Sequence, residues 1–226
     1  MLCFGNIIPL RKPYVTYAMK LGQKKILSIF MLFLFSGSII SLAANLFMQP
    51  SNNTPTMTDT VVMETSKGVI EIELNREKAP ITVENFENYV NEGFFDGLCF
   101  HRVIKGFMIQ GGGFYVNATY KPPSDPIQIE SSNGLKNLKG TIAMARSSDP
   151  NSATSQFFIN TVDNPNLDYP SFDGYGYTVF GTVTVGMDVV LQIENVATGT
   201  MDTPYGPMDD WPIEPVEIIK AYMKTE

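Results

Sequence analysis

The stretch FHRVIKGFMIQGGG at residues 100–113 decides the fold. It is dense in apolar and glycine residues, and together with the residues from Phe94 onward it predicts two strands joined by a tight turn at Lys105-Gly106. On such a unit Arg102 and Gln110 return to the same neighbourhood, with apolar side chains beside them. A cation, an amide that can hold it and an apolar floor are poorly suited to hydrolysis. They are well suited to receive a tertiary amide.

The flanking segments carry further strand and helix patterns. Apolar and polar residues alternate in 61–65 and 69–74, on either side of a turn at 66–68. This pattern predicts a β-hairpin with one solvent-exposed face. Pro80 opens a helical pattern that Gly93 closes, and a shorter helix is expected from Met187 to Glu194. Further strands are expected at 141–145, 156–160, 178–183 and 215–224. Many short strands with two helices favour a mainly β, closed or nearly closed architecture over βαβ winding.

The N-terminal 44 residues have the layout of a secretory signal. Ile26–Met48 holds 23 residues without a charge, a cationic patch precedes it, and small residues around Ala44 offer a cleavage site. Met19 is a more ordinary start for such a signal than Met1. An uncleaved membrane anchor at 1–44 is the alternative, although serines and a glycine weaken the segment as a spanning helix. We expect a flexible tether at 45–59, one domain at 60–226, and an exported, periplasmic location, with membrane contact only if the leader is uncleaved.

Charge and residue counts exclude several classes of function. The segment 1–44 holds five of the 16 basic residues and no acidic one, so the remainder carries eleven basic against 23 acidic residues, a formal charge of −12. That balance opposes nucleic acid as a partner. One histidine and two cysteines in the chain exclude a His-rich metal cage and a disulfide scaffold, so no metal is expected. The acidic residues between Asp202 and Glu217 lack the EF-hand spacing and are expected to be a solvated surface.

Conventional catalytic motifs are absent from the sequence. It contains no GxSxG elbow, no Walker loop and no HExxH. The triple glycine at 111–113 is not followed by a helix start or by Lys-Ser/Thr, so it is a weak candidate for a phosphate loop. His101 has no acidic or thiol partner in the signature, and Cys99 is expected to be a buried small hydrophobe.

Four motifs in order resemble those of cyclophilin-type peptidyl-prolyl isomerases, most closely the exported bacterial branch. They are FHRVIKGFMIQGGG, then GTIAMAR at 140–146, SATSQFFIN at 152–160 and YTVFG at 177–181. The similarity extends over about residues 60–224. It implies a mainly β fold, a closed eight-stranded antiparallel barrel capped by two α-helices. It also implies an enzyme that accelerates rotation about X-Pro bonds in exported proteins and assists their folding.

The resemblance assigns roles position by position. Arg102 matches the family's catalytic arginine, which stabilises the twisted amide, and Gln110 matches the residue that orients it. The other matched positions form the substrate groove, and they are Phe107, Met108, Ala145, Arg146, Gln156, Phe158, Leu167 and Tyr177. Ala145 and Arg146 are expected to meet the substrate mostly through backbone. The resemblance implies no cofactor, proline-containing polypeptides as partners, and a monomer.

Three positions depart from many eukaryotic members of the family. Asn166 stands where those members have a tryptophan, Tyr177 replaces a pocket histidine, and Arg146 replaces an asparagine. The one tryptophan, Trp211, is expected in a C-terminal loop. Catalysis is therefore expected to be retained and binding of cyclosporin to be weakened.

Each candidate residue also has a plain structural interpretation, and two other functions compete with the enzyme. Arg102 alone would be a surface ion-pair residue, and Phe107, Met108 and Phe158 would be core. A holdase would grip proline-containing segments without turnover, and an adhesive surface protein would stay at the membrane. The joint presence of Arg102, Phe107, Gln110 and Phe158 favours the enzyme.

Overall fold

The computed structural model describes residues 57–225, and the expected leader at 1–44 lies outside the described residues. The first strand begins at Met57, within the segment expected to be a tether. No helix in the described part of the chain is both long enough and apolar enough to cross a bilayer.

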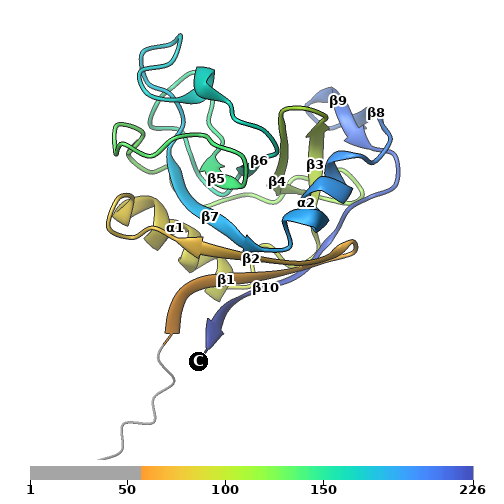
Figure 1. The fold of residues 1–226 in the computed structure, drawn as a ribbon. Helices are drawn as coiled ribbons and strands as arrows, with labels where there is room; N and C mark the ends of the chain where they lie inside the picture. The colour runs from red at the N-terminus through yellow and green to blue at the C-terminus, as the bar shows by residue number, and fades with distance from the viewer. Residues whose placement is uncertain (1–56, 226) are drawn as a thin grey trace, which may run out of the picture. The chain divides into compact units, whose positions relative to one another are not determined.

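The described chain consists of ten strands, two α-helices and one short 3₁₀ helix, shown in Figure 1. In chain order these are β1 (Met57–Thr65), β2 (Gly68–Leu74), α1 (Pro80–Asn91), β3 (Leu98–Ile104), β4 (Met108–Tyr115), β5 (Thr141–Met144), β6 (Phe157–Asn160), η2 (Pro165–Leu167), β7 (Val179–Val185), α2 (Met187–Glu194), β8 (Thr198–Thr203), β9 (Gly206–Pro212) and β10 (Ile218–Thr225). The predicted hairpin at 61–74, both predicted helices and the predicted strands are confirmed.

Eight of the strands form one antiparallel sheet in the order β10-β1-β2-β7-β5-β6-β4-β3. The sheet curls, and its edge strands meet through one isolated bridge between Cys99 and Glu217. Hydrogen bonds from Gly97 N to Ile218 O (2.8 Å) and from Phe100 N to Val216 O (2.9 Å) add to this seam. The mainly β, eight-stranded prediction is confirmed. The expectation of a closed barrel is overstated, because no continuous ladder of hydrogen bonds joins the edge strands β3 and β10.

The core lies on the concave side of the sheet, and both α1 and α2 contribute buried residues to it. Pro80 begins α1, where its missing N–H is not needed for helical hydrogen bonding. Phe86 is fully buried on the inner face of α1 and packs against the rings of Phe95, Phe157 and Phe180 at centroid distances of 5.1, 5.6 and 5.0 Å. Aromatic pairs at such distances add about 0.5–1.5 kcal/mol beyond their buried area. The aromatic core therefore fixes the strands on which the outward side chains stand.

A two-stranded hairpin, β8–β9, is the element that the sequence analysis did not anticipate. It lies beside β3, as Figure 1 shows. Trp211, expected in a loop, belongs to β9 and is buried at 2% exposure against Phe114 and His101. The prediction was wrong because the polar residues of 198–210 show no clear strand pattern. The hairpin is held by tertiary packing, in which Trp211, Met201 and Met208 join the cluster around Phe114.

Candidate functional site

A cavity of about 150 Å³ brings together nine of the ten residues predicted for the site. Its lining consists of Arg102, Phe107, Met108, Gln110, Ala145, Arg146, Phe158, Leu167 and Tyr177. Gln156, the tenth, lines an adjoining hollow of about 440 Å³ that shares Gln110, Ala145 and Arg146 with the first. These residues come from β3, β4 and the turn between them, from β6 and the position just before it, from η2, and from the loops after β5 and η2. The structure therefore brings the residues predicted for the site together in one place, while their roles in binding or catalysis stay predictions.

A β-bulge in β3 turns Arg102 toward this cavity. Phe100 pairs with Gly111 and Arg102 pairs with Gln110, so β3 holds one residue, His101, that has no counterpart on β4. Strict alternation would put Arg102 on the same face as Phe100, which is fully buried in the core. The extra residue reverses the alternation, so Val103 packs in the core and the Arg102 side chain is 39% exposed.

Alternation along β4 and β6 supplies the apolar floor of the cavity. Ile109 and Ile159 point into the core, while Met108 and Phe158 form part of a separate cluster on the outer face. The Phe158 ring meets the Tyr177 ring edge-on at 5.8 Å between centroids. The result is a small apolar socket with a cation at its rim, which is the composition typical of a small-ligand site.

Gln110 lies directly opposite Arg102 in the β3–β4 pair, as the strand–turn–strand prediction requires. Its side-chain nitrogen donates a hydrogen bond to Gln156 Oε1 at 3.0 Å. Gly113 leaves room for Gln156, because a Cβ at 113 would lie 2.8 Å from the Gln156 amide. At least one glycine of the triple-glycine motif thus serves close side-chain packing.

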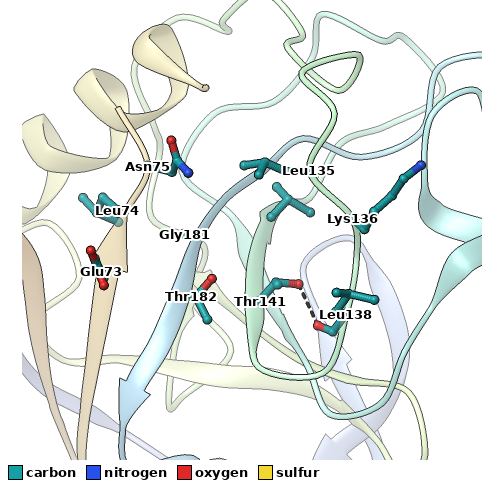
Figure 2. A pocket seen from close by; sticks show the side chains of 10 residues that line it. Glu73, Leu74, Asn75, Leu135, Lys136, Leu138, Thr141, Gly181 and Thr182 are labelled. Carbon is teal, nitrogen blue, oxygen red and sulfur yellow. Dashed lines mark hydrogen bonds between the residues drawn. The ribbon is translucent and has the colours of Figure 1, made fainter. Parts of the chain in front are cut away.

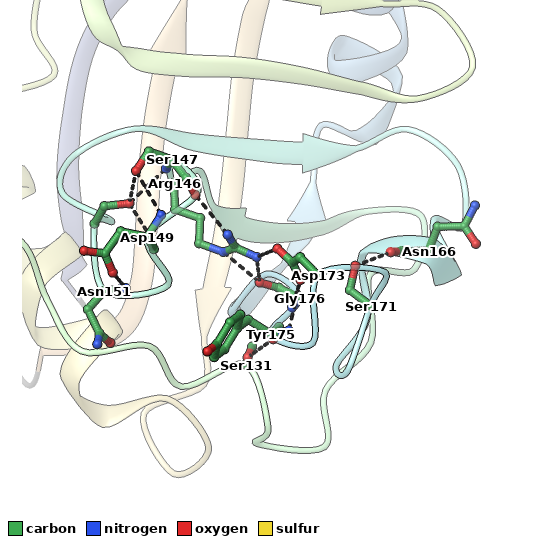
Figure 3. A network of polar contacts seen from close by, with 11 residues as sticks. Ser131, Arg146, Ser147, Asp149, Asn151, Asn166, Ser171, Asp173, Tyr175 and Gly176 are labelled. Atoms are coloured by element: carbon green, nitrogen blue, oxygen red, sulfur yellow. Dashed lines mark hydrogen bonds and ion pairs between the residues drawn. The ribbon is translucent and has the colours of Figure 1, made fainter.

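The Arg146 side chain is 3% exposed and is used by the loop that follows η2 (Figure 3). Its Nε and Nη2 donate to Gly176 O at 2.9 and 2.8 Å, Nη1 donates to Ser147 O at 2.9 Å, and Nη2 also pairs with Asp173. The guanidinium lies 4.5 Å from the centroid of the Tyr177 ring. The hydrogen bond from Arg146, together with backbone donors in the loop, lowers the pKa of Asp173 to about 2. The guanidinium of Arg146 is therefore engaged by the loop, and contact of a substrate with the Arg146 backbone stays a prediction.

One charged residue beside Arg102 was not among the predicted site residues. Asp210 in β9 lies with its Oδ2 atom 3.8 Å from Arg102 Nε, although the acidic residues of this region were expected to be only a solvated surface. Glu214 and Asp209 are exposed, as predicted. No local signal could have revealed the contact with Arg102, because it depends on the unanticipated hairpin.

His101 and Cys99 are both fully buried behind the site. Burial lowers the pKa of His101 to about 4, so the imidazole is neutral at pH 7. Burial likewise raises the pKa of the Cys99 thiol to about 12. Neither group reaches the cavity lining, so both are structural.

A second hollow, of about 350 Å³, lies away from these residues (Figure 2). It is lined by β2, β5, β7 and the loop at 135–138, and the Thr141 hydroxyl donates to Leu138 O across its edge at 2.8 Å. It contains none of the predicted site residues. Within residues 57–225, no group of three or more His, Cys, Asp or Glu side chains is placed to hold a metal ion.

Comparison with known proteins agrees with this arrangement. Residues 60–223 match the family model of the cyclophilin type peptidyl-prolyl cis-trans isomerase/CLD family. A peptidyl-prolyl cis-trans isomerase of Acinetobacter baylyi is 53% identical over 165 residues, which cover 73% of this chain and 85% of that protein. Peptidyl-prolyl cis-trans isomerase B of Escherichia coli is 53% identical over 141 residues, covering 62% and 86%.

A solved structure also matches. It is a cyclophilin type peptidyl-prolyl cis-trans isomerase of Cryptosporidium parvum, crystallised in the presence of the dipeptide Ala-Pro. The TM-score is 0.61 at 25% sequence identity, and the match covers 74% of this chain and 99% of that chain.

The curled eight-stranded sheet with two helices and the socket on its outer face define a cyclophilin fold. The chain belongs to the cyclophilin-type peptidyl-prolyl cis-trans isomerase family. The enzyme class predicted from the sequence is thereby confirmed.

Proposed function

We propose that this isomerase receives X-Pro segments of exported polypeptides in the cavity on β3, β4 and β6 and assists their folding. One observation supports this most directly: the cavity joins the Arg102 guanidinium to an apolar socket that includes Phe107, Met108 and Phe158. The dipeptide used with the C. parvum relative has the same X-Pro chemistry.

The reaction needs little more than selective binding of a twisted amide. Rotation about the X-Pro bond faces a barrier of about 18–20 kcal/mol, because the nitrogen lone pair is conjugated with the carbonyl. In the twisted state the nitrogen regains its lone pair and becomes a better hydrogen-bond acceptor. A donor placed to meet it stabilises the transition state more than the planar ground state, which is the condition for catalysis.

In this proposal Arg102 is the donor and the socket holds the ring. No hydrogen bond within residues 57–225 occupies the Arg102 side chain, so its N–H groups are available to a substrate. Phe107, Met108, Phe158 and Leu167 grip the proline ring, Tyr177 closes one side, and Ala145 offers backbone. Gln110 and Gln156 line the path of the flanking residues.

Export is proposed on the layout of residues 1–44, with the periplasm as the destination. The test is the mass of the mature protein after expression in a Gram-negative host and its recovery from the periplasmic fraction. Removal of the residues up to about Ala44 supports export with cleavage. A full-length protein in the cytoplasm contradicts it.

Turnover is tested in a protease-coupled assay on an Ala-Pro peptide, with the full chain and two variants. Arg102→Ala is expected to lower kcat/KM about 100-fold or more, the effect of removing one transition-state donor. Lys105→Ala removes an exposed cation from the adjacent turn, outside the cavity lining, and is expected to have no effect. Equal turnover of wild type and Arg102→Ala would remove Arg102 from the mechanism. Peptide binding without acceleration by wild type would leave a holdase.

A further inference from the structure

We propose that Asp210, on the β8–β9 hairpin, is a positioning residue that orients the guanidinium of Arg102 for the isomerase reaction. The inference rests on the proposed role of Arg102 and extends it to a residue outside the cavity lining.

Asp210 is the acidic group that faces Arg102. The Oδ2 atom of Asp210 lies 3.8 Å from Arg102 Nε, and within the described part of the chain no other carboxylate lies within ion-pair distance of Arg102. Both side chains are about two-fifths exposed, at 39% and 41%. A carboxylate on the Nε side restricts how the planar guanidinium can turn and leaves its terminal N–H donors for a substrate.

The backbone of β9 is distorted at the point where Asp210 stands. Gly199 pairs with Trp211 and Met201 pairs with Met208, so β9 carries one more residue than β8 between these pairs, a bulge at positions 209–210. Asp210 has a φ of +62°, a region that residues other than glycine rarely adopt. Bulges re-aim side chains, and strained residues of this kind gather at functional sites.

Two bulges therefore meet across the β3–β9 contact. One, at His101, turns Arg102 out of the core, and the other turns Asp210 toward it. Trp211, the neighbour of Asp210, is buried against His101, the extra residue of the first bulge, with ring centroids 5.8 Å apart. The buried pair fixes the distance between the strands, so the carboxylate is presented from a rigid support.

The orienting role that the family resemblance implies for Gln110 is not visible as a contact with Arg102 among residues 57–225. Gln110 uses its amide nitrogen to bond Gln156 at 3.0 Å, and no hydrogen bond among residues 57–225 joins it to Arg102. Asp210 fills that role from the other side of β3.

The test compares Asp210→Asn with a matched control, Asp209→Asn, in the full-length isomerase. Asn tolerates a positive φ, so the backbone is preserved while the charge is lost. Asp209 is an exposed acid on the same strand that accepts a hydrogen bond from Thr200 (2.7 Å) and does not face Arg102, so its substitution makes the same change in net charge. The readouts are kcat and KM for an Ala-Pro peptide and the temperature of unfolding.

Asp210→Asn is expected to lower kcat about three- to five-fold with KM unchanged, the range of a half-exposed ion pair, and Asp209→Asn to change neither. Asp210→Glu is expected to recover part of the loss. Asp210→Gly, which accepts the positive φ without strain, is expected to reproduce the loss. In the Arg102→Ala background, Asp210→Asn is expected to add nothing, because the residue acts through Arg102.

An equal effect of the Asp209 and Asp210 variants would overturn the proposal, as would a loss confined to KM or a loss that persists without Arg102. These outcomes are separate from failure of the proposed function, which would appear as full turnover of Arg102→Ala or as peptide binding without acceleration by the wild type.

Discussion

Arg146 and Asp173 form an ion pair that fastens the loop after η2 to the end of β5. Through the same guanidinium, Arg146 holds Gly176 O and lies over the Tyr177 ring, so one side of the cavity depends on this buried charge. The position was expected to contact substrate through its backbone. The structure adds that its side chain supports the wall of the socket.

Arg146→Ala is expected to release that wall. Without the guanidinium, Tyr177 and Leu167 lose their fixed places, so KM for an Ala-Pro peptide should rise several-fold while kcat falls less. The Asp173 carboxyl provides an independent signal, because its pKa of about 2 depends first on the hydrogen bond from Arg146. NMR titration should show that pKa returning toward the ordinary value of 3.8 in the variant. An unshifted Asp173 titration would contradict the ion pair.

Phe107→Ala is expected to reduce kcat/KM about 10-fold or more, since burial of a phenyl ring against a ligand contributes roughly 1.5–3 kcal/mol. Phe107 lines the cavity and is only half-buried, so the fold should tolerate the change. Phe172→Ala is the matched control, because Phe172 is 85% exposed and outside the cavity lining. Equal activity of both variants would place the proline ring elsewhere.

The buried imidazole of His101 predicts a pH dependence of stability. Its pKa is lowered to about 4 in the folded state against 6.5 in the unfolded chain, so between these values the unfolded state binds a proton that the folded state does not. The free energy of unfolding should be unaffected by His101 above pH 6.5 and should fall by up to about 3 kcal/mol as the pH drops to about 4. Denaturant unfolding of wild type and His101→Phe across this range measures the difference. Parallel curves for the two proteins would contradict the assignment.

Alanine substitutions at two glycines of the β3–β4 region distinguish the cost in stability of backbone strain from the cost of steric crowding. Gly106→Ala meets only the strain of a φ of +72°, since no atom lies within 4 Å of the added Cβ, and should cost about 1 kcal/mol. Gly112→Ala meets a φ of +86° and places its Cβ 2.6 Å from Ser155 O, so it should cost about 3 kcal/mol or more. Thermal or denaturant unfolding gives both values. A Gly112 variant as stable as the Gly106 variant would show that the strands move apart freely.

Local sequence patterns predicted most of the secondary structure. The helix from Pro80 ends at Asn91, just before Gly93, and the hairpin at 61–74 and the helix at 187–194 appear where the pattern placed them. These elements depend on neighbours a few residues away: a proline that suits a first helical turn, a glycine that ends one, and alternation along a strand. The residues that the ordered motifs match to the family also gather at one cavity, which is the grouping that the resemblance implied.

The sequence by itself determined which side chains belong to the socket, and the tertiary structure decided how they are held. The bulge at His101 that turns Arg102 outward, the burial of Trp211, the hairpin that presents Asp210 and the inward course of Arg146 all follow from contacts between distant segments. Arg102 and Asp210 stand on strands that are far apart in the sequence but in contact in space. The distance between them is set by the packing of the Trp211 indole against the His101 imidazole. The periodic pattern of apolar residues in a sequence reflects only neighbours along the chain. The packing of distant side chains depends instead on their shape and volume where two strands meet.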